Sequence, residues 1–233
     1  MKTSAWLIIA QTNLHVGNES TNNYGIIDKA IQRDPLTNLP CINSSSLKGA
    51  INEFVSQSKK LSAEQRKKIF GSDKTGSIGE TQKGEATFFD GNILYLPQQN
   101  NDSLYQLVNA KAVIDKFISQ IKILQKGDTN GDISSDIQQK ITNYAKKTLC
   151  VSTAVFCDKC SDEELPIIAR NKLLENGESD NLWYEQILPA QTIMGTIIRE
   201  TNDTPLSTAI NGQIIQIGAN ASIGYGYCKF IKL

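Results

Sequence analysis

Residues 40–50 read PCINSSSLKGA, and the chain continues as INEFV through residue 55. The apolar residues after the serines recur at the spacing of one helix face, and they are Leu47, Ile51, Phe54 and Val55. This pattern predicts a helix that begins near the serines. A helix start carries unpaired backbone N–H groups and the positive end of the helix dipole, so it favours an anion. This helix start, with Lys48, is therefore a candidate phosphate-binding element, but serines before a helix are more often plain caps, and the residues alone favour that interpretation.

Apolar segments rich in β-branched residues predict strands along the rest of the chain. The expected strands are Ala5–Thr12, Ala86–Leu96, Val151–Phe156, Ile187–Arg199, Gln213–Gly218 and Tyr227–Ile231. A short helix is expected after Ser62, where Ser62 and Gln65 fit a capping box, and it should stop at Phe70–Gly71. Further helices are expected at 107–124 and 137–145. Interleaved strands and helices predict an α+β or α/β fold, with polar surface insertions at 72–84 and 126–136 that are mobile without a ligand.

The composition limits what the chain can do by itself. With 233 residues, 39% of them hydrophobic, we expect one elaborated domain that spans residues 1–233. The 24 basic and 24 acidic residues argue against a free-standing protein that grips nucleic acid by bulk electrostatics. Any such contact should be local and shared among subunits. The apolar run Ala5–Ala10 is too short to cross a bilayer, so we expect a cytoplasmic protein without a membrane partner.

The five cysteines are an odd number at low density, which predicts reduced thiols. Cys157 and Cys160 have the spacing of half a zinc knuckle, but the second half is missing. Buried or idle thiols are therefore the favoured interpretation, and a structural zinc ion is the alternative.

Several motifs, taken in order, resemble those of one protein family. They are H-x-G at His15 and Gly17, D-x-x-I-Q-R at Asp28–Arg33, S-S-L-K-G at Ser45–Gly49, LWYE at Leu182–Glu185 followed by Leu188-Pro189, and IGANASIGYG at Ile217–Gly226. In order and spacing they resemble the RAMP-superfamily backbone subunits of Cmr-type (type III-B) CRISPR effector complexes, the repeated subunits that cleave target RNA. The landmarks span nearly the whole chain.

The resemblance implies a fold and a set of partners. The fold would be α+β, with a ferredoxin-like (RRM-like) palm, inserted helices and an extended thumb β-hairpin that reaches into the guide–target duplex. Several copies would stack as a filament along a guide (CRISPR) RNA, with complementary target RNA and other Cmr subunits as partners. Such a protein reads RNA by backbone and shape and leaves sequence to base pairing, which suits the neutral net charge.

The resemblance also implies roles for individual residues. Asp28 matches the catalytic aspartate, and a carboxylate there can hold a divalent cation, Mg²⁺ or Mn²⁺, that activates water or the ribose 2′-hydroxyl. The residues expected to bind RNA are His15, Gly17, Gln32, Arg33, Ser44, Ser45, Ser46, Lys48, Gly49, Gly218, Asn220, Gly224 and Tyr225. Those expected in the thumb near the target are Leu188, Pro189 and Gln191. Without the motif, Asp28 would be interpreted as a turn residue or a salt-bridge partner.

Gln191 departs from the family pattern, which has an acidic residue shortly after the Leu-Pro pair. An amide can hydrogen-bond a phosphate or ribose but supplies no charge to a metal, so slower cleavage is expected if the acid matters. Glu185 is the nearest substitute, and an ordinary strand-edge residue is the competing interpretation. Two other functions stay open: an architectural guide-RNA-binding subunit without cleavage, and a precursor-processing ribonuclease that uses His15 in metal-independent acid–base chemistry.

Overall fold

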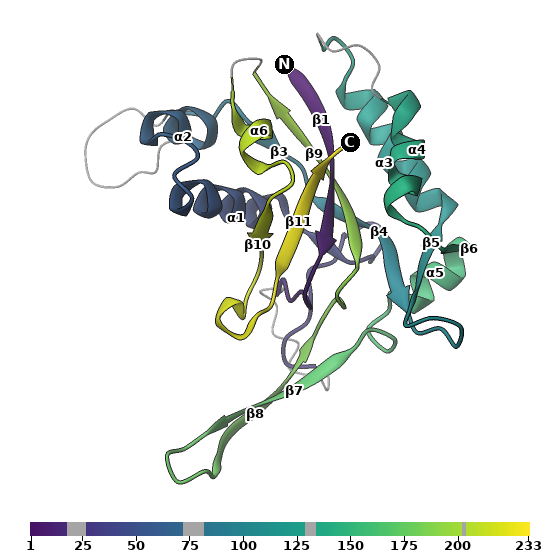
Figure 1. The fold of residues 1–233 in the computed structure, drawn as a ribbon. Coiled ribbons are helices and arrows are strands. Elements are labelled where there is room, and N and C mark those ends of the chain that lie inside the picture. Colours follow the sequence, from purple (N-terminus) through teal and green to yellow (C-terminus); the bar gives the residue numbers. More distant parts are fainter. Residues whose placement is uncertain (18–26, 72–81, 129–133, 202–203) are drawn as a thin grey trace.

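The computed structural model describes residues 1–17, 27–71, 82–128, 134–201 and 204–233 (Figure 1). Its strands are β1 (Lys2–Ala10), β2 (Cys41–Ile42), β3 (Thr87–Phe88), β4 (Gly91–Gln98), β5 (Gln106–Ala110), β6 (Thr148–Val151), β7 (Ile167–Leu173), β8 (Ser179–Gln186), β9 (Ile193–Glu200), β10 (Ile214–Gln216) and β11 (Tyr227–Lys232). Its α-helices are α1 (Ser44–Gln57), α2 (Ala63–Phe70), α3 (Lys111–Leu124), α4 (Ser134–Tyr144), α5 (Thr153–Lys159) and α6 (Leu206–Ile210), and a 3₁₀ turn spans Ala221–Ile223.

The described strands form one large sheet and one separate hairpin. The sheet order is β10-β11-β1-β9-β4-β5-β6, with β2 paired to β4 and β3 paired to β9. Its central strands lie side by side as β11-β1-β9-β4, each antiparallel to its neighbours. Along the chain, α1 lies between β1 and β4, and α6 lies between β9 and β11. This βαββαβ order is the one found in ferredoxin-like cores, and the predicted α+β class is confirmed.

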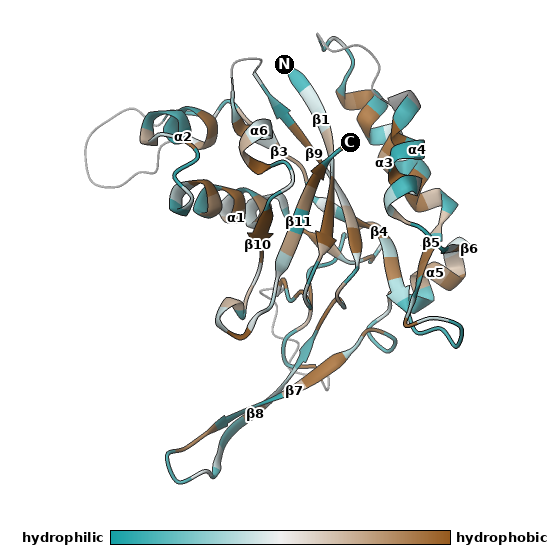
Figure 2. Ribbon diagram, viewed as in Figure 1, coloured by the Kyte–Doolittle hydropathy of each residue, from teal (hydrophilic) through white to brown (hydrophobic). Residues whose placement is uncertain are grey.

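The centre of the sheet is covered on both faces, which explains the continuous apolar run in β1. Leu7 pairs with Gly195 and faces α3, where a Cβ on Gly195 would come within 2.9 Å of the Phe117 ring. Ile8 points to the opposite face, where it lies near Leu47 of α1 around Gly91. A strand buried on both faces has no polar side to alternate with its apolar side. Figure 2 shows the hydrophobic residues gathered in these central strands.

Strands β7 and β8 form a hairpin that projects from the body of the protein (Figure 1). Ile167 pairs with Gln186 at its root, and Leu173 pairs with Ser179 near its tip. All residues from 171 to 182 are exposed. This is the extended hairpin expected of a thumb, and we call it the thumb hairpin. Because its outer part buries so little, contacts at its root must set its direction.

The two helices predicted after residue 43 are confirmed, but the serine cap of the first is wrong. Asn43 is the N-cap of α1 and makes no side-chain cap, while Asp90 Oδ1 accepts a hydrogen bond from the Ser44 backbone N–H at 2.6 Å. The predicted capping box of α2 is present. Ser62 Oγ accepts from the Gln65 N–H at 3.1 Å, and Gln65 Oε1 accepts from the Ser62 N–H at 2.9 Å.

One predicted helix begins too early, and one predicted strand has the wrong type. Residues 107–110 lie in strand β5, and the helix predicted from residue 107 begins only at Lys111. The strand predicted at 151–156 is mostly helix α5, because the Ser152 side chain accepts a hydrogen bond from the Val155 N–H at 3.3 Å and caps it. Apolar β-branched residues therefore misled the prediction at a short capped helix.

The strand predicted at 187–199 begins later, at Ile193. Pro189 has no N–H for a strand ladder, and Gln191 has a positive φ of 73°, so the preceding residues cannot continue the sheet. Of the insertions predicted at 72–84 and 126–136, residues 72–81 and 129–133 lie outside the described residues, as does the prediction of their mobility, and residues 134–136 begin α4. None of the helices in the described ranges is long and apolar enough to cross a bilayer.

Candidate functional site at the root of the thumb hairpin

Residues 27–33, which we call the Asp28 loop, are attached to β8 along the edge that does not pair with β7. The backbone N–H groups of Asp28 and Lys29 each donate to the Tyr184 carbonyl at 3.1 Å, and the Gln186 N–H donates to the Lys29 carbonyl at 2.9 Å. The Asp28 side chain completes the attachment, because its Oδ2 accepts from the Tyr184 N–H at 2.7 Å. Asp28 itself is exposed. The thumb root therefore fixes the direction of an acid that stays open to solvent.

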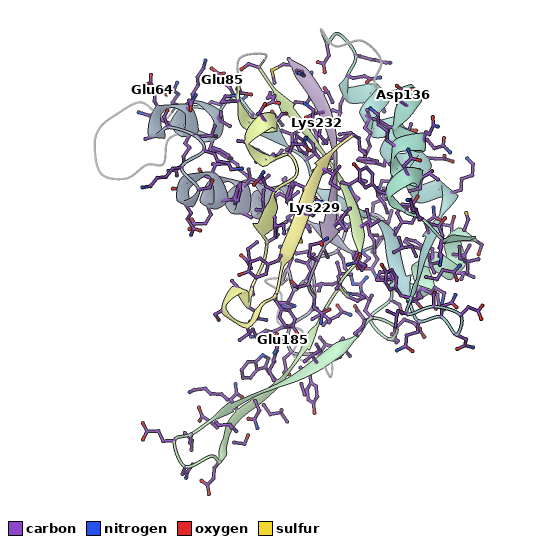
Figure 3. All side chains as sticks on the ribbon, in the orientation of Figure 1. Glu64, Glu85, Asp136, Glu185, Lys229 and Lys232 are labelled. Carbon is purple, nitrogen blue, oxygen red and sulfur yellow. The ribbon has the colours of Figure 1, made fainter. Side chains whose placement is uncertain are left out.

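Glu185 lies at the base of the thumb hairpin (Figure 3). It is a buried carboxylate with four side-chain donors, one of them from this loop. Its Oε1 accepts from Lys29 Nζ at 3.0 Å and from Trp183 Nε1 at 2.7 Å. Its Oε2 accepts from Arg170 Nε at 3.3 Å and from Asn220 Nδ2 at 2.7 Å. Burial alone would raise the pKa of Glu185, but the hydrogen bonds from Trp183, Lys29 and Asn220 outweigh it and lower the pKa to about 2.

The two cations that contact Glu185 also make cation–π contacts with aromatic rings. Lys29 Nζ lies 4.8 Å from the centre of the Trp183 ring, and the Arg170 guanidinium lies 4.6 Å from the centre of the Tyr225 ring. Tyr225, expected to stack on RNA, is thus already in contact with a protein cation. Its role toward RNA stays a prediction.

Both oxygens of Glu185 are committed to protein donors, which removes it as a substitute for the acid that Gln191 replaces. In the described part of the chain, no three His, Cys, Asp or Glu side chains come together as a metal site. Among the described residues at the root, Asp28 presents an exposed carboxylate, whereas the exposed Asp162 already accepts hydrogen bonds from Arg33 and Gln186. The half zinc knuckle gains no support either: Cys160 is buried, and burial raises the pKa of its thiol to about 12.

His15 is buried and serves the packing of the root. Only 2% of the residue is exposed, and its Nδ1 is 2.7 Å from the Gln186 carbonyl oxygen. A Cβ on Gly17 would lie 3.1 Å from His15 Nε2, so the glycine of the H-x-G motif makes room for the ring. Gly218 has a φ of 80°, and a Cβ there would lie 2.2 Å from the His15 carbonyl oxygen. The first motif and the last motif of the sequence are therefore packed against each other.

Gln32 and Arg33 join the loops inside the protein. Gln32 Nε2 donates to the Gly17 carbonyl and to Ser46 Oγ, each at 3.2 Å, and its Oε1 accepts from the Asn43 N–H at 2.7 Å. Arg33 donates to Asp162 Oδ1 at 2.6 Å. Its Nη1 also donates to two backbone carbonyls. These side chains organise the site, and their contact with RNA stays a prediction.

The start of α1 forms a second, separate part of the site. An open pocket of about 350 Å³ there is lined by Ser44, Ser45, Lys48, Lys83, Gly84, Ala86, Thr87 and Phe88. Gly49 is exposed, with nothing within 4 Å of where its Cβ would be. Lys48 and Lys83 beside the start of a helix suit a phosphate, although the Asp90 carboxylate already accepts from the Ser44 N–H.

Leu188, Pro189 and Gln191 were expected in the thumb near the target, but they lie just after the thumb hairpin, whose second strand ends at Gln186. Their proximity to target RNA stays a prediction. Leu188 is buried and exchanges backbone hydrogen bonds with Leu14 at 2.8 and 2.9 Å. The Pro189 carbonyl accepts from Thr192 Oγ1 at 2.7 Å, and the Gln191 N–H donates to the Ala10 carbonyl at 2.6 Å. At the other edge of the root, Gly224 is exposed in the left-handed turn that ends the 3₁₀ segment, with a φ of 83°.

The sequence profile of the RAMP superfamily matches residues 8–229. The chain belongs to the RAMP superfamily. A Pyrococcus furiosus protein named CRISPR system Cmr endoribonuclease Cmr4 is 26% identical over 94% of this RAMP chain and 91% of its own length. The fold is similar to a chain of a type III-B Cmr-β complex in the apo state, at a TM-score of 0.80 and 18% identity over 99% of this chain and 97% of that one. It is also similar to oligomeric Cmr4 from Pyrococcus furiosus, at a TM-score of 0.70 and 20% identity over 100% and 98% of the two chains.

Sequence reasoning missed the residues that build the root of this RAMP protein. Lys29, Arg170 and Gln186 were not singled out, and Glu185 was considered only as a replacement acid. The one available signal is a run of residues, Trp183 to Gln186, that mixes large aromatic and polar side chains in a segment with no apolar alternation. Such a run does not reveal which distant residues its polar groups meet.

Proposed function

We propose that this RAMP protein is a repeated backbone subunit of a type III-B (Cmr) CRISPR ribonucleoprotein that binds guide RNA and cleaves complementary target RNA at regular intervals. Support comes from 26% identity, over 94% of the chain, to a protein named as a Cmr endoribonuclease. The same fold occurs in a type III-B Cmr-β structure bound to cognate target RNA, at a TM-score of 0.80. Cleavage rests on one observation, the exposed Asp28 carboxylate held by the backbone of the thumb root.

Asp28 would act as a fixed acceptor beside the target strand. The Tyr184 N–H orients the carboxylate through Oδ2, so the group can accept a proton or a hydrogen bond from a ribose 2′-hydroxyl or a water. A divalent cation, Mg²⁺ or Mn²⁺, would supply positive charge to the scissile phosphate. Because no three His, Cys, Asp or Glu side chains come together among the described residues, RNA oxygens would have to complete the coordination of that cation.

The guide RNA would be held by its backbone at the start of α1. Lys48 and Lys83 give this pocket local positive charge, although the whole chain is neutral. A subunit that grips only a few nucleotides needs neighbours, so copies stacked along the guide would share the binding. Other Cmr subunits would complete the complex.

An architectural subunit without cleavage is the second candidate. Gln191 favours it, because an amide stands where the family pattern has an acid, and its backbone is fixed to Ala10. A precursor-processing ribonuclease that uses His15 is disfavoured, because the ring is buried and held by Gln186.

The test is cleavage of end-labelled target RNA by the reconstituted complex with Mg²⁺, Mn²⁺ or a chelator. Wild type, Asp28→Ala and the exposed, distant control Asp102→Asn would be compared. Regularly spaced products that disappear with Asp28→Ala and with the chelator, but persist with Asp102→Asn, are expected. Target binding without cleavage by the wild type under every metal would replace this function with the architectural one.

A further inference from the structure

Four segments of the thumb root meet at the side chain of Glu185. Its donors come from the Asp28 loop (Lys29), from β7 (Arg170), from β8 (Trp183) and from the C-terminal turn (Asn220). Each oxygen takes two donors, so its capacity to accept hydrogen bonds inside the protein is used in full. A single carboxylate thus links elements that lie up to 191 residues apart in the chain, from Lys29 to Asn220.

The position of Glu185 in the chain connects this cluster to Asp28. Tyr184, the preceding residue, accepts and donates the backbone hydrogen bonds that hold Asp28. Lys29, the residue after Asp28, is the Glu185 partner on the loop side. Any shift of Glu185 would therefore move both sides of the attachment that directs the Asp28 carboxylate.

The charges make the cluster intolerant of a neutral side chain at this position. Lys29 and Arg170 both direct their positive groups at Glu185, and the Arg170 Nη2 atom is buried without a hydrogen-bond partner in the structure. A glutamine would present an N–H₂ group to donors that need an acceptor, and it would leave two cations without their shared counter-charge. The root would then open where the Asp28 loop meets β8.

We infer that Glu185 is a positioning residue, which sets the direction of Asp28 relative to the thumb hairpin by joining the Asp28 loop, both hairpin strands and the C-terminal turn. The inference has a catalytic part, that the direction of Asp28 matters for cleavage, and this part rests on the proposed cleavage function. It also has a mechanical part, that Glu185 holds the Asp28 loop against the hairpin. The mechanical part does not rest on that function, because it concerns hydrogen bonds within the protein. The two parts can therefore fail separately.

Amide hydrogen exchange tests the mechanical part in the intact protein. In Glu185→Gln, the amides of Lys29, Tyr184 and Gln186 should exchange at least about tenfold faster than in wild type, because local opening becomes easier. The amides of the α1 helix should be unchanged. Glu53→Gln on that helix is the matched control, since it removes an exposed carboxylate, and it should leave all three root amides unchanged. Unchanged root amides in Glu185→Gln would overturn the inference whatever the cleavage results.

Single-turnover cleavage in the reconstituted complex tests the catalytic part. With saturating target, Glu185→Gln should cut about 100-fold more slowly, because misplacing a catalytic group by about 1 Å has effects of this size. Target affinity should stay within about threefold of wild type. A rate equal to wild type would overturn the catalytic part of the inference, and so would a loss of target binding that accounts for the whole effect. If Asp28→Asn leaves cleavage unchanged, the proposed function fails and takes the catalytic part with it.

Trp183→Phe is a second variant, which keeps the test decisive if Glu185→Gln fails to fold. It removes one hydrogen bond to Glu185 and keeps an aromatic ring beside Lys29. The exchange rates of its root amides and its single-turnover cleavage rate should change in the same direction as in Glu185→Gln but by a smaller factor. Faster root exchange with a normal cleavage rate in this variant would contradict a positioning role.

Discussion

The central sheet and the root of the thumb hairpin are both buried, yet different forces hold them. Strand β1 buries Trp6 and Leu7 completely among apolar neighbours on both faces of the sheet. The root buries Glu185, Gln186 and His15, which are 1%, 0% and 2% exposed, through hydrogen bonds and ion pairs. Apolar burial stabilises the fold but does not fix the orientation of individual groups, whereas charge-assisted hydrogen bonds do fix the orientation of the groups that they join. The stability of the fold and the geometry of the site should therefore respond to different substitutions.

Truncation in the sheet should have the largest effect on stability. Trp6→Ala removes a fully buried ring, and we expect the free energy of unfolding to fall by about 3–5 kcal/mol. Denaturant unfolding measures this loss. Where the variant is still folded, the Lys29 and Tyr184 amides should exchange as in wild type. Opening of the root in this variant would break the proposed separation between the two regions.

Acid should weaken the root more than the sheet. The pKa of Glu185 is lowered from 4.5 to about 2, so its contribution to stability is fully present above the unfolded value and is lost as the pH falls through the folded value. The difference corresponds to roughly 3 kcal/mol at most, at about 1.4 kcal/mol per pKa unit. Between pH 5 and about 2, the free energy of unfolding should fall more steeply with decreasing pH in wild type than in Glu185→Gln. Equal slopes would show that Glu185 gains little from its donors.

A methyl group added between sheet and helix should have an intermediate effect. In Gly195→Ala the new Cβ would lie 2.8 Å from Leu94 and 2.9 Å from Phe117, both buried. Overpacking of this kind costs about 1–3 kcal/mol, which thermal unfolding can resolve. Phe117→Leu in the same chain should recover part of the loss. No recovery would mean that the α3 face is not where the strain lies.

An ion pair on the outer hairpin should matter least. Lys172 Nζ lies 2.6 Å from Asp180 Oδ2, and both side chains are substantially exposed. Lys172→Met should change the free energy of unfolding by less than about 1 kcal/mol, because water and salt screen such pairs. Root amide exchange should also be unchanged. A larger effect on the root would show that the hairpin is directed along its length and not only at its base.

Sequence patterns within one segment predicted the helices that depend mainly on residues of that segment. The apolar spacing after residue 46 and the Ser62 capping box specified α1 and α2, because both depend on residues within a few turns. The thumb strands escaped detection, since residues 171–182 are exposed and show no apolar alternation. The family resemblance predicted that a thumb hairpin exists, but the residues alone did not locate it.

The sequence motifs supplied some members of the candidate site, but not their roles, and not Lys29, Arg170 or Gln186. The motifs at Asp28, His15, Gln32 and Gly218 do converge near the thumb root and the adjoining loops. Burial, which the sequence does not display, separates them: Asp28 is exposed, whereas His15 is internal. The Glu185 cluster depends on donors from four distant segments, and no spacing in the sequence encodes such a meeting.

The most direct test of the account is the single-turnover rate of target-RNA cleavage by complexes that contain Asp28→Asn. The substitution keeps the shape of the side chain, and its oxygen can still accept from the Tyr184 N–H. We expect cleavage to fall by at least about 100-fold, as for loss of a catalytic acid–base group, with thermal stability and target affinity unchanged. Cleavage at the wild-type rate would contradict the assignment of the site to Asp28.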